Sequence, residues 1–76
     1  MTKSRIILAM EVWAKHGVDP EPLPVRVALE AVGSDRAYTG TRGVLTRFAK
    51  PHGFAVVSTS TGQLWLHPES LEEVES

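Results

Sequence analysis

The residues best suited to bind another molecule lie between positions 36 and 52. This segment holds four permanent cations, no acidic residue and several side chains that form hydrogen bonds. Arginine and lysine bind phosphates, and arginine also forms paired hydrogen bonds with guanine. The segment therefore predicts a nucleic-acid surface, although cations are also common on the solvated face of a core helix. The candidate contact residues are Arg36, Tyr38, Thr39, Thr41, Arg42, Thr46, Arg47 and Lys50.

The small net charge of −1 hides an uneven distribution. Residues 34–53 contain four basic residues against one acidic residue, whereas residues 54–76 contain four glutamates and no lysine or arginine. Local fields, more than net charge, decide where a polyanion docks. We expect residues 69–76 to form an acidic, flexible tail that either is simply solvated or shields the basic segment.

No other chemistry is indicated by the sequence. Cysteine is absent, and the three histidines stand far apart without paired ligand spacing, so we expect no metal site. No nucleophile motif or phosphate-binding loop is present, so we expect neither catalysis nor a cofactor. The apolar run Ile6–Met10 is far too short to span a membrane. These features predict a cytoplasmic protein.

Three helices and a hairpin are expected to position the candidate residues. Ile6, Met10 and Trp13 repeat with helical spacing, which predicts a helix from about Lys3 to His16 ended by Gly17. A second helix is expected from Leu23 or Pro24 to Val32, and a third between Arg36 and Lys50. Two β-prone runs, 54–59 and 63–67, flank Ser60-Thr61-Gly62 and predict a hairpin.

This element order resembles the winged helix-turn-helix superfamily. Residues 22–33 correspond to the scaffold helix, 34–50 to the turn and recognition helix, and 54–67 to the wing. The resemblance implies an α+β fold: a three-helix helix-turn-helix core with a C-terminal β-hairpin wing, spanning residues 1–68. It also implies a small transcriptional regulator that inserts its third helix into duplex DNA, with Ser60 and Thr61 of the wing alongside. Such a small module is expected to act as a dimer or on a paired site.

A different function is also compatible with the sequence. The near-zero net charge, the uncharged wing and the acidic tail favour an adaptor or inhibitor that binds a larger protein machine. Trp65 alternates with Leu64 and Leu66, so either the tryptophan or the leucine pair faces outward. An outward tryptophan would indicate a protein interface. Gly40 and Gly43 allow either close approach of a partner or an irregular, tightly packed helix.

Overall fold

The amino-terminal helix α1 spans Arg5–His16, which confirms the helix predicted for this part of the chain. Ser4 caps it, because the serine hydroxyl accepts a hydrogen bond of 3.2 Å from the Ile7 backbone N–H. Gly17 ends it in the left-handed conformation and donates its N–H to the Trp13 carbonyl. The sequence around this helix therefore contains both its start and its stop.

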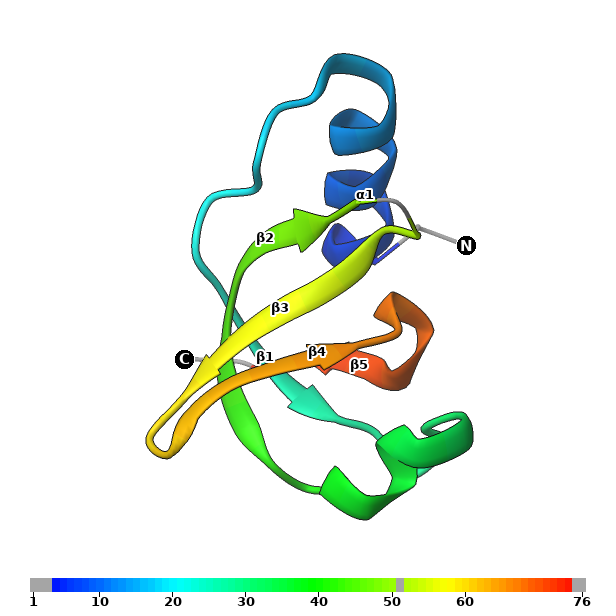
Figure 1. Ribbon diagram of the computed structural model, residues 1–76, viewed down its shortest axis with the longest axis vertical. Helices are drawn as coiled ribbons and strands as arrows, with labels where there is room; N and C mark the ends of the chain where they lie inside the picture. Colours follow the sequence, from blue (N-terminus) through cyan, green and yellow to red (C-terminus); the bar gives the residue numbers. More distant parts are fainter. Residues whose placement is uncertain (1–3, 51, 75–76) are drawn as a thin grey trace.

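A five-stranded antiparallel sheet forms the rest of the domain (Figure 1). The computed structural model describes residues 4–50 and 52–74. The strands are β1 (Leu23–Val27), β2 (Arg42–Ala49), β3 (Phe54–Thr59), β4 (Gly62–Leu66) and β5 (Leu71–Glu73), in the order β4-β3-β2-β1-β5. Two short 3-10 turns, η1 (Gly33–Tyr38) and η2 (Pro68–Ser70), precede β2 and β5. Among the described residues, no helix is long and apolar enough to cross a membrane.

The central strand β2 pairs with its two neighbours over different parts of its length. Residues 42–45 of β2 pair with β1, and residues 44–49 pair with β3. The register shifts between Leu45 and Arg47, which marks a bulge at Thr46. Bulges of this kind increase the local twist and bend a strand. One side of the sheet encloses the core, whose largest fully buried apolar side chains are Ile6, Val25, Val27, Leu45 and Leu66.

Helix α1 covers the open side of the curled sheet. Ile6 is 1% exposed, and Ala9, Met10 and Trp13 pack against the core cluster. The Trp13 ring lies 5.7 Å from the ring of Phe48 on β2. The Glu73 carboxylate accepts a 2.7 Å hydrogen bond from the Arg5 backbone N–H, which places a negative charge at the positive end of the helix.

The predicted three-helix core and the winged-helix fold are wrong. The second predicted helix is replaced by strand β1, in which Leu23, Val25 and Val27 are buried while Pro24 is exposed. This two-residue alternation is the period of a strand. Pro24 is tolerated because it precedes Val25, where pairing with β5 begins, and prolines are accepted near strand ends.

The third predicted helix is also wrong: this segment is the 3-10 turn η1 followed by strand β2. Gly40 has a φ of +87°, which no α-helix accommodates. At Gly43, a Cβ atom would lie 2.5 Å from the Ser58 carbonyl oxygen of β3 and 2.6 Å from a Val57 methyl group. Gly40 therefore permits a turn, and Gly43 permits β3 to approach β2 closely.

The predicted hairpin is present as β3 and β4, but it belongs to the five-stranded sheet and is no separate wing. The predicted acidic tail is folded where it is described. Leu71 is buried, and residues 71–73 pair with β1. Glu72 binds Arg26 at 2.8 Å and Glu73 caps α1, so these two acids do not shield the basic segment. Residues 75–76 of the predicted tail lie outside the described residues.

Candidate nucleic-acid interface

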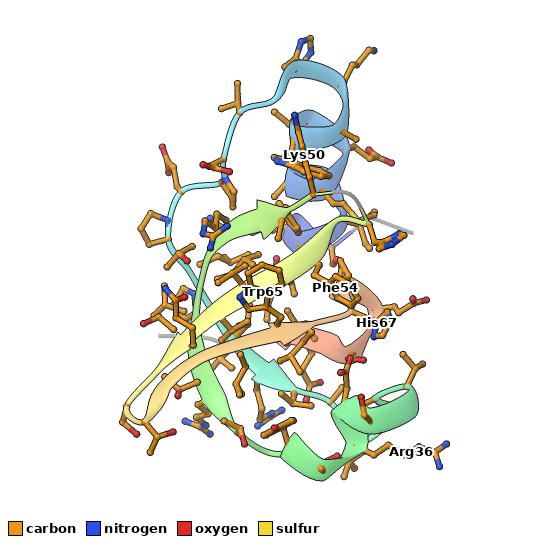
Figure 2. The ribbon with its side chains drawn as sticks, in the orientation of Figure 1. Arg36, Lys50, Phe54, Trp65 and His67 are labelled. Carbon is orange, nitrogen blue, oxygen red and sulfur yellow. The ribbon has the colours of Figure 1, made fainter. Side chains whose placement is uncertain are left out.

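The eight predicted contact residues separate into two groups. Arg36, Tyr38 and Thr39 lie in or directly after η1, and Figure 2 shows Arg36 far from Lys50, at the opposite end of the molecule. The Arg36 Nε donates to the Ala31 carbonyl at 3.2 Å, and the Thr39 hydroxyl donates to the Arg36 carbonyl at 2.8 Å. This first group therefore stabilises its own turn and is not part of a shared cationic surface.

The second group follows strand β2. Arg42, Thr46 and Arg47 belong to the strand, and Lys50 follows its end and is exposed. Arg42 is paired in register with Arg26 of β1, whose charge is balanced by Glu72. The strand therefore carries cations along its length, but it presents them from a sheet and not from an inserted helix.

Arg47 and Trp65 form the central contact of the outer sheet face. The Arg47 Cζ atom lies 5.6 Å from the centroid of the Trp65 ring, in a cation–π arrangement. Val56 of β3 is the register partner of both residues, and it is 0% exposed. The two long side chains thus close over Val56 while Trp65 itself stays 54% exposed.

Two further rings extend this surface. Phe54 lies two residues before Val56 on β3, so its side chain shares the Val56 side of the strand. The ring of His67 lies 5.1 Å from the Phe54 ring, edge to face, and the His52 ring lies 6.1 Å from the Phe54 ring. Figure 2 shows Trp65, Phe54 and His67 on the same side of the strands. We call the set Arg47, Phe54, Trp65 and His67 the Trp65 face.

Acidic side chains are excluded from the strands that carry this face. Residues 36–67, which include all of β2, β3 and β4, contain no aspartate or glutamate. The acids of the chain precede or follow this segment, and two of them are engaged by Arg26 and the start of α1. The Trp65 face therefore combines aromatic rings with the guanidinium of Arg47, on strands that carry no carboxylate.

A buried carboxylate fixes one end of the Trp65 face. The Asp35 Oδ2 atom accepts hydrogen bonds from the His67 backbone N–H, the His67 Nδ1 and the Ser70 hydroxyl, at 2.9, 2.9 and 2.8 Å. Burial alone would raise the pKa of Asp35, but these donors and the charge of His67 outweigh it and hold the pKa below its ordinary value. This network joins η1 to η2 and sets the position of the His67 ring.

Asp, His and Ser side chains also form catalytic triads, but this arrangement differs from one. In a triad the histidine stands between the carboxylate and an accessible serine. Here Ser70 donates directly to Asp35, is 0% exposed, and accepts the Val32 N–H at 3.1 Å. The buried serine is therefore not accessible to a substrate, and the hydrogen bonds of this cluster stabilise the contact between η1 and η2. Within residues 4–50 and 52–74, no three His, Asp or Glu side chains are grouped to hold a metal ion.

The remaining predicted residues have local roles. The Thr46 hydroxyl donates to the Val56 carbonyl at 3.3 Å and thereby secures the bulge, and the Thr41 carbonyl accepts the Val27 N–H. Ser60 and Thr61 form the exposed tip between β3 and β4, on the strands of the Trp65 face but beyond its rings. Their hydroxyl groups can add polar contacts to a ligand at that end of the two strands. In the described part of the chain they form no hydrogen bond with the cations.

Sequence reasoning missed Phe54 and His67 and left Trp65 undecided. The available signal was the alternation along Gln63–His67, where Leu66 proves buried and Trp65 exposed. The fold and this surface define the class of protein: a small antiparallel β-domain with a covering helix and an aromatic, cationic sheet face. Comparison of the chain with protein-family models, with curated proteins and with solved structures found no match.

Proposed function

We propose that this protein binds single-stranded nucleic acid on the Trp65 face. The observation that carries the proposal is the half-exposed Trp65 ring with the Arg47 guanidinium against it, on strands that contain no acidic residue. Proteins that bind single strands combine aromatic rings, on which bases stack, with cations that follow the phosphates. Trp65 and the Phe54–His67 pair supply the rings, and Arg47 supplies a cation on the face itself. Arg42 and Lys50, at the two ends of β2, supply further cations for the phosphates.

The exposed ring favours a single strand over the duplex DNA expected from the sequence. Bases in a duplex are stacked on each other, so a flat aromatic ring on a sheet has no base face to contact. A duplex reader would instead present a helix or a narrow ribbon to the major groove. In the structure, the basic segment forms β2 in the middle of the sheet. A strand in that position cannot enter a DNA groove as the predicted helix would.

Binding is measured by fluorescence anisotropy of labelled dT and rU oligonucleotides about 12 nucleotides long, with a duplex of the same length as competitor. Three phosphate contacts predict that log K falls against log salt with a slope of about −2, at about −0.7 per contact for single strands. Absence of binding at about 100 µM protein and low salt would overturn the proposal. Equal affinity for the duplex would overturn its single-strand part.

Two matched pairs of variants locate the site. Trp65→Ala should weaken binding by about 5- to 150-fold, because stacking contributes about 1–3 kcal/mol per base, whereas Trp65→Phe should retain most of the affinity. Tyr38→Ala removes a ring of similar exposure outside the face and should leave binding unchanged. Likewise, Arg47→Ala should weaken binding and Arg36→Ala should not. If Arg36→Ala and Arg47→Ala have equal effects, the cations of β2 are not the site.

The absence of cysteine fits a reducing cytoplasm, where we place the protein. The alternative function is an adaptor that binds a larger protein. The half-exposed Trp65 ring favours it, because aromatic side chains are enriched at protein interfaces.

A further inference from the structure

An apolar groove runs between helix α1 and the linker that connects it to β1. The groove has a volume of about 370 Å³ and is lined by Leu8, Ala9, Val12, Val18, Pro20 and Leu23. Figure 1 shows the linker returning from the end of α1 toward β1. Leu8, Val12 and Val18 are 44%, 46% and 56% exposed, so three of the seven exposed large apolar side chains among residues 4–50 and 52–74 gather here. Such clustering is typical of an interaction surface.

The helix wall of the groove is a ridge of apolar side chains on α1. Leu8 and Val12 are four residues apart, so they project from one face of α1 as neighbours. Rows of side chains at this spacing are the ridges that pack into grooves between helices. Each molecule therefore carries an apolar ridge and an apolar groove within one patch.

The charges around this patch are also complementary to each other. The helix carries the exposed cations Arg5 and Lys15, and the linker carries the exposed acids Asp19 and Glu21. Arg5, Asp19 and Glu21 line the rim of the groove itself. A helix that enters the groove with basic flanks meets an acidic linker, and α1 is a helix of this kind.

We propose that two copies of this chain associate through this patch as a two-fold dimer. The Leu8–Val12 ridge of each copy fills the groove of the other, and the cations of each helix face the acids of the other linker. A two-fold interface uses the same patch on both subunits, as this one does. The dimer leaves both Trp65 faces free, because α1 and the linker contribute nothing to them. The proposal does not depend on nucleic-acid binding.

Sedimentation equilibrium of the whole chain from about 1 µM to about 1 mM tests the association. We expect a reversible monomer–dimer equilibrium. Leu8→Lys should raise the dissociation constant at least about 100-fold, since each dimer loses two ridges. The control Leu29→Lys changes a side chain that is 85% exposed outside the groove and should leave the equilibrium unchanged. A monomer throughout this range would overturn the proposal and assign the groove to another occupant.

Charge reversal tests the pairing with variants that change only exposed residues. One variant, Asp19→Lys with Glu21→Lys, and a second, Arg5→Glu with Lys15→Glu, should each weaken self-association at least about tenfold. An equimolar mixture should form a heterodimer, because the first variant adds two cations to the patch and the second adds two acids. Circular dichroism confirms that each variant is folded. A dimer insensitive to Leu8→Lys, or a mixture without heterodimer, would place the interface elsewhere.

Discussion

We expect replacement of Asp35 to destabilise this protein more than replacement of any other acidic residue that the structure describes. Its carboxylate is 4% exposed and joins two segments 32 residues apart, because η1 carries Asp35 and the residue before η2 is His67. All three hydrogen bonds end on one oxygen atom, Oδ2. Asp35→Ala therefore removes an entire polar connection and leaves the His67 backbone N–H without its acceptor.

The magnitude follows from these three bonds. Hydrogen bonds to a charged group contribute about 1.5–3 kcal/mol each, and a buried donor left without a partner costs about 1–3 kcal/mol. Because the His67 ring is partly exposed, water can replace one of the three bonds. We expect a loss of about 3–5 kcal/mol for Asp35→Ala, out of a total of about 4–11 kcal/mol for a domain of 76 residues. The melting temperature should fall by roughly 15–30 °C.

Thermal unfolding followed by circular dichroism measures this loss. Glu30→Ala is the control, because Glu30 is exposed in the turn after β1 and its replacement should change stability by less than about 0.5 kcal/mol. A fall of less than about 4 °C for Asp35→Ala would refute the reasoning, since it corresponds to less than about 1 kcal/mol.

The same carboxylate predicts a pH dependence of defined sign. The pKa of Asp35 is lowered on folding, so its contribution is fully present above the unfolded pKa of about 3.9. That contribution is lost as the pH falls through the lower folded pKa. The stability difference between the wild type and Asp35→Asn should therefore be largest above about pH 5 and shrink toward pH 2. A difference that is constant over this range would show that the charge of Asp35 contributes nothing.

Three further changes give smaller or simpler tests in the same unfolding assay. Gly43→Ala should cost about 1–3 kcal/mol, because its Cβ would lie 2.5 Å from the Ser58 carbonyl oxygen; an unchanged melting temperature would mean that β2 and β3 separate easily. Ser4→Ala should cost about 1 kcal/mol by removing the helix cap, and Ser4→Asp should restore it. Glu72→Ala should cost less than about 1 kcal/mol, because the side chains of Arg26 and Glu72 are 39% and 43% exposed; any loss should vanish in high salt.

The elements predicted correctly are those whose signals are local. Helix α1 has its apolar spacing, its serine cap and its glycine stop within residues 4–17. The hairpin has two β-prone runs around a turn that contains Gly62. In both cases the interactions that define the element join residues close in sequence, so composition and spacing were sufficient.

The elements predicted wrongly are those that depend on distant partners. Residues 25–32 have helical spacing at Val25, Ala28, Leu29 and Val32, but Leu29 is 85% exposed and packs against nothing that would hold a helix. Strand β1 forms because β2 and β5 pair with it on either side, and β5 lies more than 40 residues away in the sequence. Pairing over such separations overrides weak local preferences, because strand propensity largely reflects packing against neighbouring strands.

The candidate site was also predicted only in part, because its geometry depends on a single inserted residue, Thr46. The cations of β2 were identified from the sequence, yet strict alternation from Val44 would place Thr46 opposite Val56 and turn Arg47 toward the core. The bulge at Thr46 inserts one residue, so Arg47 becomes the partner of Val56 and reaches Trp65 on the outer face. Phe48 is moved inward by the same shift and packs on Trp13. The bulge therefore completes the core and creates the Arg47–Trp65 contact in one step, which makes the proposed binding surface a consequence of how the sheet closes.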